Sequence, residues 1–212
     1  STKMLKHLSF EERWNVLSHS FGVIYSLIGI LYIFQLYPPK SFPEFVGLTI
    51  YGSSLIFLFL ASSIYHYVDN NNKAFWQKVD HIGIYFLIAG TYTPVTLTVL
   101  KESSGNIILY LVWTLALIGI IYKLLYINKF QKFSLILYLL MGWLVLVDFK
   151  NIISLFPKDQ LVFLMSGGFF FTFGTIFYQW QKLHLNHLIW HLFVLLGAGL
   201  HLVMITKIYS NL

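Results

Sequence analysis

Seven long apolar segments follow one another along the chain, separated by short stretches that hold most of the charged residues. A membrane-spanning helix needs roughly 20 mostly apolar residues, because an α-helix rises about 1.5 Å per residue. The segments that meet this requirement are residues 15–37, 45–66, 80–100, 105–126, 133–153, 160–180 and 186–208. Asp148 and Lys150 interrupt the far end of the fifth. The pattern predicts an all-α integral membrane protein, a seven-transmembrane-helix bundle in which residues 1–212 form a single domain.

The composition agrees with a protein that lies in lipid. Hydrophobic residues make up 58% of the chain and charged residues 10%, whereas soluble domains carry about 25% charged residues. The absence of cysteine excludes both a disulfide framework and a thiolate metal site. The net charge of +6 comes largely from lysines scattered through short loops, as membrane topology produces, so we expect no nucleic-acid partner.

The distribution of basic residues predicts an orientation for the bundle. An odd number of spans places the two termini on opposite sides of the membrane. The side of the N-terminus collects nine basic residues: Lys3, Lys6, Arg13, Lys73, Lys78, Lys123, Lys129, Lys132 and Lys182. The other side collects five: Lys40, Lys101, Lys150, Lys158 and Lys207. Because basic residues favour the cytoplasmic side, we expect a plasma-membrane protein with a cytoplasmic N-terminus and an external C-terminus.

Several polar residues, unusual within spans, fall at one depth on the predicted inner side. They occupy the inner ends of spans 2, 3 and 7: His66, Asp80, His187 and His191. Ser62 lies four residues before His66, on the same helical face. Ionisable residues inside a membrane are costly and usually functional. His201 lies about 15 Å further across the bilayer than His191, so it cannot share a ligand set with His187. We expect it to hydrogen-bond within the bundle or to face the outer interface.

This set of residues fits a catalytic metal site. His187 and His191, four residues apart, share a helix face and could chelate one ion, and His66 would supply a third ligand. Three histidines leave one tetrahedral position open, the pattern of catalytic zinc, and zinc lowers the pKa of its bound water to about 7. Asp80 could orient that water or accept its proton, and Ser62 could hydrogen-bond the water or an oxyanion.

Simpler interpretations of the same residues stay open. Ser62 could bond back to its own helix, as hydroxyls in membrane spans often do. A haem with ligands on two helices is the rival to zinc, since His19 or His201 could face His66. Glu12, Asn15 and His19 share a face entering the first span and could line the same inner cavity. Alternatively, that segment is an ordinary helix N-terminus with favourable acidic residues.

At these residues the sequence resembles the hemolysin III family, the bacterial branch of the progestin and adipoQ receptor family. The resemblance rests on "ERWNVLSH" at 12–19, "SSIYH" at 62–66, "VDHIGIYFLIAGTYTP" at 79–94, "MGW" at 141–143 and "HLIWH" at 187–191. It implies a seven-helix membrane fold with zinc near the cytoplasmic side. By motif position, His66, His187 and His191 match the zinc ligands, Asp80 the aspartate beside the metal, and Ser62 the serine one turn before the first histidine.

The resemblance also suggests a reaction, because the animal relatives are receptors associated with ceramide hydrolysis and the pattern is similar to that of alkaline ceramidases. We therefore expect a zinc-dependent hydrolase of a lipid amide or ester, with membrane lipids as partners. One alternative is a non-enzymatic sensor or receptor in which zinc staples spans 2 and 7. Another is a transporter or lytic protein, although the almost wholly apolar middles of spans 2, 4 and 5 argue against a conducting path.

Overall fold

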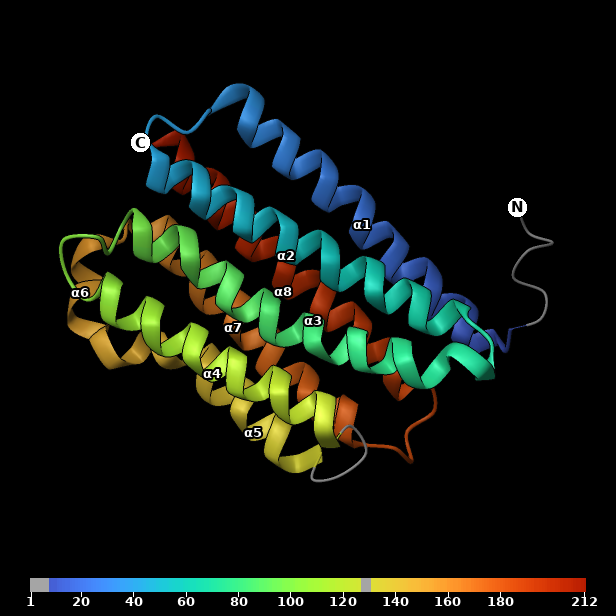
Figure 1. The fold of residues 1–212 in the computed structure, drawn as a ribbon. Coiled ribbons are helices and arrows are strands. Elements are labelled where there is room, and N and C mark those ends of the chain that lie inside the picture. The colour runs from blue at the N-terminus through green and yellow to red at the C-terminus, as the bar shows by residue number, and fades with distance from the viewer. Residues whose placement is uncertain (1–7, 127–130) are drawn as a thin grey trace.

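In the computed structural model, residues 8–126 and 131–212 are described, and all regular elements among them are helices. Lys3, Lys6 and Lys129, which enter the count of basic residues, lie outside the described residues. The helices are α1 (Phe10–Leu36), α2 (Phe42–Tyr67), α3 (Asn70–Leu97), α4 (Gly105–Tyr126), α5 (Gln131–Gly142), the short 3₁₀ helix η1 (Leu144–Asp148), α6 (Phe149–Leu155), α7 (Lys158–Gln179) and α8 (Asn186–Ser210) (Figure 1).

Six helical segments in the described part are long and apolar enough to cross a membrane. They are α1, α2, α4, the segment Lys132–Leu155, α7 and α8. The protein is therefore a multi-pass protein of the cell membrane. The helix α3 is not among the six, because its first turns carry the polar stretch 70–73 and its interior carries Asp80 and His81. That α3 forms the seventh crossing remains a prediction.

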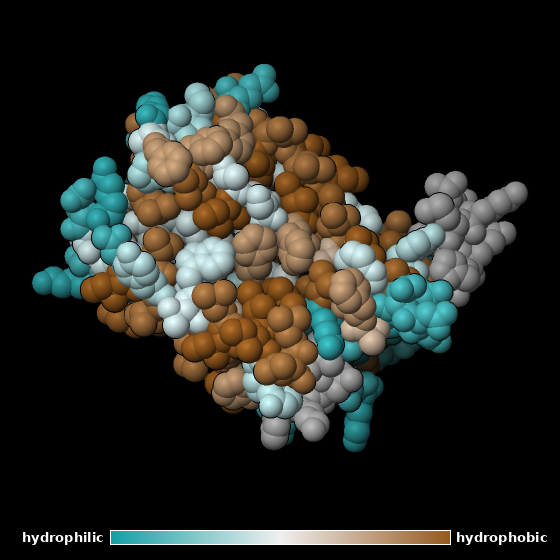
Figure 2. Space-filling view, in the orientation of Figure 1, coloured by the Kyte–Doolittle hydropathy of each residue, from teal (hydrophilic) through white to brown (hydrophobic). Residues whose placement is uncertain are grey.

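Consecutive helices pack side by side, and the last returns to the first. The strongest packing joins α2 with α3, α7 with α8, and α1 with α2, while α8 also packs on α1. Figure 1 shows the long helices running along one common direction, with the start of α1 and the end of α8 at opposite ends of the bundle. Hydrophobic residues cover the middle of the face seen in Figure 2, and hydrophilic residues gather towards its ends. This is the surface that a bilayer requires.

Polar residues at the turns determine where the first three helices begin. The side chains of Ser9, Ser41 and Asp69 accept hydrogen bonds from backbone N–H groups in the first turns of α1, α2 and α3. Such capping satisfies N–H groups that have no partner within the helix. The caps at Ser9 and Asp69 lie within about one turn of Glu12 and of the first residues of α3, so they define where these segments enter the bundle.

The fifth predicted span is a broken helix rather than a continuous one. The helix α5 ends at Gly142, and the chain continues through η1 into α6. The hydroxyl of Tyr92, on α3, donates to the Gly142 carbonyl at 2.8 Å and accepts from the Val145 N–H at 2.9 Å. Tyr92 thus satisfies two backbone groups that the break exposes, which is the condition for irregular backbone at membrane depth.

Candidate metal centre

Three histidine side chains from two helices converge at one end of the bundle. His66 comes from the last turn of α2, and His187 and His191 come from the first turns of α8. Each offers a ring nitrogen, and these three atoms all lie within 4.8 Å of one another. The ring centroids form a nearly regular triangle, with separations of 4.9, 4.9 and 4.7 Å. The sequence prediction that these residues meet is confirmed, and the group could hold a metal ion.

A carboxylate holds the far side of the His66 ring. The distance from His66 Nδ1 to Glu12 Oε2 is 2.6 Å, and Lys73 Nζ lies 3.5 Å from Glu12 Oε1. An ionised carboxylate can only accept a hydrogen bond, so Nδ1 of His66 carries the proton and donates it. The Nε2 lone pair of His66 is then directed towards the other two histidines. A carboxylate behind a ligating histidine is the usual way to fix its tautomer and orientation.

His191 has a similar support from α1, the helix that also carries Glu12. Ser18 Oγ donates to the Asn15 carbonyl at 3.0 Å and lies 3.2 Å from His191 Nδ1. Because the hydroxyl hydrogen is already used, Ser18 Oγ accepts from His191 Nδ1–H, and Nε2 of His191 is left free. The ring of His19 stacks on that of His191, with a centroid separation of 3.6 Å and an interplanar angle of 11°. Helix α1 therefore supports two of the three histidines without supplying a ligand.

The distance between His66 and His187 matches that of two ligands of a tetrahedral metal ion. Nε2 of His66 and Nε2 of His187 lie 3.2 Å apart. Two nitrogens bound to one tetrahedral zinc at 2.0–2.1 Å would be separated by about 3.3 Å. The second ring nitrogens of His66 and His191 are engaged by Glu12 and Ser18, which is the pattern that metal-binding histidines require. The donor set of three imidazoles suits zinc and the neighbouring transition metals rather than magnesium or calcium.

The same geometry argues against a haem between facing histidines. His19 lies flat on His191, and His201 Nε2–H donates to the Leu164 carbonyl at 3.1 Å. Neither ring stands opposite His66 across a space that a porphyrin would fill. For His201 the expectation of a hydrogen bond within the bundle is confirmed.

Asp80 and Ser62 line a cavity that begins beside the three histidines. Asp80 lies within electrostatic range of His66 and beside the Ser62 hydroxyl, and it is not a member of the three-ligand group. Ser62 is almost fully buried, and its Oγ makes no hydrogen bond to its own helix among the described residues. The simpler interpretation, in which this hydroxyl bonds back to its helix, is therefore wrong. The roles assigned to the two side chains remain predictions.

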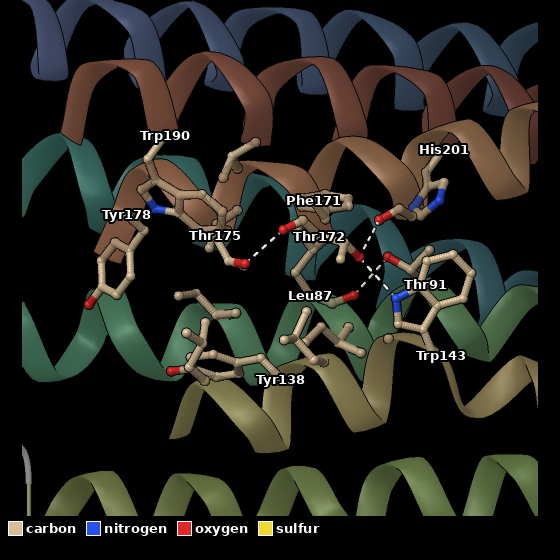
Figure 3. A pocket seen from close by; sticks show the side chains of 18 of the residues that line it. Leu87, Thr91, Tyr138, Trp143, Phe171, Thr172, Thr175, Tyr178, Trp190 and His201 are labelled. Atoms are coloured by element: carbon tan, nitrogen blue, oxygen red, sulfur yellow. Dashed lines mark hydrogen bonds between the residues drawn. The ribbon is translucent and has the colours of Figure 1, made fainter. Parts of the chain in front are cut away.

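The cavity extends from the histidines between α3, α5, α7 and α8. Trp190 and Tyr178 lie at one end of the view in Figure 3 and Trp143 and His201 at the other, with Tyr138 between them. Most of its lining is apolar, and the hydroxyls of Thr91, Thr172 and Thr175 bond to their own helices: Thr91 to Leu87, Thr172 to Gly168 and Thr175 to Thr172. A long apolar space that ends at a cluster of polar side chains suits an amphiphile.

Comparisons with known proteins agree with this architecture. A model of the family described as Haemolysin-III related matches residues 8–202. The chain belongs to this family. It is 37% identical over 202 residues to Hemolysin-3 of Bacillus cereus, a match that covers 93% of this chain and 92% of that protein. It is also 37% identical over 192 residues to a Hemolysin-3 homolog of Bacillus subtilis (strain 168), with 89% and 90% covered.

The relationship extends to animals. The human monocyte to macrophage differentiation factor is 29% identical over 214 residues, covering 95% of this chain and 86% of that protein. The resemblance to the hemolysin III family drawn from the sequence is therefore confirmed.

One supporting residue escaped the sequence analysis. Ser18 lies three positions after Asn15, and Asn15 lies three positions after Glu12. The helical spacing that grouped Glu12, Asn15 and His19 therefore also includes Ser18. The prediction that this face of the first helix lines the inner cavity is confirmed for His19. Glu12 and Asn15 lie with it on the side of α1 that supports the histidines.

Proposed function

We propose that the protein is a zinc-dependent membrane hydrolase that cleaves a lipid amide or ester. The observation that carries this proposal is the junction of two features. One ring nitrogen from each of the three histidines lies within 4.8 Å of the other two, and an apolar cavity that Asp80 and Ser62 also line starts there. When bound at such a point, zinc supplies Lewis acidity that polarises a carbonyl and makes water nucleophilic at neutral pH.

The protein's own residues would divide the remaining work. The apolar cavity would hold the lipid tail and exclude water, which places the scissile carbonyl beside the histidines. The Asp80 carboxylate would orient the attacking water and accept its proton. Ser62 Oγ does not bond back to its own helix and lies beside Asp80. It would donate to the oxygen that becomes negative in the transition state. Glu12 and Ser18 would keep the histidine rings in their ligating tautomers.

The proposal includes an orientation in the membrane. The helix α3 would complete a seven-helix bundle, with the N-terminus and the metal centre on the cytoplasmic side. The membrane lipids of that leaflet would be the partners, and the substrate would reach the cavity without leaving the bilayer.

Two measurements on detergent-purified protein test the proposal. Elemental mass spectrometry should find about one zinc per chain in wild type and none in His187→Ala/His191→Ala. Turnover of ceramide and of monoacylglycerol should then be followed by mass spectrometry of released fatty acid. Asp80→Asn should keep its zinc and lose turnover, because the carboxylate would act on water rather than bind the metal. Turnover that persists in Asp80→Asn, or zinc that is lost with it, would contradict the role of Asp80.

A non-enzymatic role is the second candidate, and the packing of the helices favours it. The helices α2 and α8 each pack on α1 and share little direct contact with each other, so an ion held by His66, His187 and His191 would join them. In that case chelation should lower the unfolding temperature sharply while no lipid is consumed. The name of the Bacillus cereus relative, Hemolysin-3, motivates a parallel test of dye release from liposomes.

A further inference from the structure

A second group of polar side chains, on α3, α4 and α5, lines the same cavity and lies outside the group of three histidines. Its members are His81, Lys123 and Ser134, and all three line the cavity. Lys123 is only 2% exposed and Ser134 only 1%. His81 Nδ1 has no hydrogen-bond partner among the described residues. The Ser134 hydroxyl does not bond back to its own helix, and it lies beside the Tyr85 hydroxyl. Buried polar groups are normally paired, so the three together call for an explanation.

The register of the helices brings these residues to one level. Gly119 of α4 packs against the Tyr85 ring of α3, where an added Cβ would clash. The Tyr85 ring in turn contacts that of Tyr138 on α5, with centroids 4.4 Å apart. His81, Lys123 and Ser134 each lie four residues from one of these three, in the direction of the end where α3 begins. These three residues therefore form a layer one helical turn away from the layer of Tyr85, Gly119 and Tyr138.

Contacts within the layer agree with this register. The Tyr138 hydroxyl donates to the His81 carbonyl at 3.2 Å. Both Lys123 and His187 lie within electrostatic range of His81, so this layer adjoins the metal centre. Figure 1 shows α3, α4 and α5 next to one another at this end of the bundle.

Ordinary structural roles do not account for Lys123. A lysine in the last turn of a helix can bond the terminal carbonyls, but on α4 the carbonyl of Leu124 accepts from Lys78 at 3.3 Å instead. A lysine near a membrane surface can extend to the interface, but a side chain that is 2% exposed does not. In the described part, the ion pairs engage Lys73 and Lys207 but not Lys123. An ammonium group at a cavity wall without a counter-charge is costly.

We propose that Lys123, Ser134 and His81 bind the carboxylate or phosphate head of a single-tailed amphiphile whose tail occupies the cavity. The ammonium group of Lys123 has three N–H donors, and together with a hydroxyl and an imidazole it suits an oxyanion. The adjoining apolar walls suit a hydrocarbon chain. The inference deepens the proposed function by using the same cavity, but it concerns binding and does not require turnover. It places the anionic head at α3–α5 rather than at the three histidines.

Equilibrium binding to purified protein at pH 8 tests the proposal, with oleate, oleyl phosphate, oleyl alcohol and inorganic phosphate as probes. Wild type should bind oleate or oleyl phosphate about tenfold to a hundredfold more tightly than oleyl alcohol, the range expected for hydrogen bonds to a charged group. Whichever of these two probes binds more tightly identifies the preferred head group, carboxylate or phosphate. Lys123→Met should reduce that preference to within about twofold. Lys132→Met, which removes an exposed lysine nearby, should retain it.

Further arms separate this site from the metal centre. The preference for charged probes should persist in His187→Ala/His191→Ala, because Lys123 is intact there. Its loss in that variant, or its survival in Lys123→Met, would overturn the proposal and leave the proposed hydrolase untouched. Inorganic phosphate that binds as tightly as oleyl phosphate would also overturn it, since the occupant would then be a free anion. If Lys123→Met fails to fold, Ser134→Ala should weaken oleate binding several-fold while oleyl alcohol binding stays constant.

Discussion

Glu12 offers a sharp test of the metal centre, because it supports a ligand without being one. Replacing Glu12 with alanine removes the acceptor for His66 Nδ1–H, and replacing it with glutamine keeps an acceptor but removes the charge. If the carboxylate holds His66 in its ligating tautomer, both variants should bind zinc more weakly than wild type, alanine more so than glutamine.

The structure sets the expected size of the effect. The bond from His66 to Glu12 is short, at 2.6 Å, and the histidine is 3% exposed, but the carboxylate is 31% exposed and is shared with Lys73. Hydrogen bonds to charged groups contribute about 1.5–3 kcal/mol, and partial exposure favours the lower end. A loss of about 1.5 kcal/mol corresponds to roughly tenfold weaker binding for Glu12→Ala. Charge-assisted bonds are roughly twice as strong as neutral ones, so Glu12→Gln should lose about threefold.

Zinc affinity would be measured by competition with a colorimetric chelator at constant detergent and pH. Glu11→Gln is the matched control, because it makes the same change one position away, where no hydrogen bond to the histidines exists among the described residues. An affinity of Glu12→Ala within twofold of wild type would refute the reasoning. So would equal losses in Glu11→Gln and Glu12→Gln, since a general change in charge would then explain both.

Three further predictions concern the fold. In Gly22→Ala the new methyl group would meet the Phe59 ring at 2.5 Å, so thermal unfolding should show a loss of about 1–3 kcal/mol; Gly199→Ala, with open space around it, should show none. Tyr92→Phe should lower the unfolding temperature by leaving two backbone groups at the α5 break unpaired, at about 1–3 kcal/mol each, whereas Tyr110→Phe at an exposed site should not. Because the chain lacks cysteine, Asn71→Cys and Ser210→Cys report topology directly: a membrane-impermeant maleimide on intact cells should label Ser210→Cys alone, and labelling of Asn71→Cys would contradict a cytoplasmic N-terminus.

Hydropathy could locate the helices because lipid imposes one requirement on every span. The predicted segments 105–126 and 186–208 agree closely with α4 and α8. The first residues of α1 and α3 differ more from the predicted ones, because the polar caps at Ser9 and Asp69 start both helices well before the apolar run. The break after Gly142 could not be read from the sequence. It depends on Tyr92, a residue 50 positions away, whose hydroxyl replaces the missing helical bonds.

The histidines could be grouped from the sequence because depth along a helix follows from residue number. His66, His187 and His191 fall at one level once the spans are placed, and no side-chain orientation is needed. The burial of Lys123 could not be found this way, since position alone counted Lys123 among the basic residues of the inner side. Its burial follows from the approach of Tyr85 to Gly119, which draws α4 against α3. Tertiary packing, not local pattern, turns that lysine from a topology signal into a cavity residue.

The two polar groups together give the cavity a direction. Both His191 and the layer of Lys123 lie towards the end of the bundle where α3 and α8 begin. His201, which also lines the cavity, lies ten residues further along α8, about 15 Å away. An amphiphile with its head at Lys123 or its carbonyl at the histidines must therefore direct its tail towards Trp143 and His201. Tails that exceed this length have to bend or emerge between helices. The walls of the cavity, rather than the ligands of the metal, would then select the chain length of the lipid.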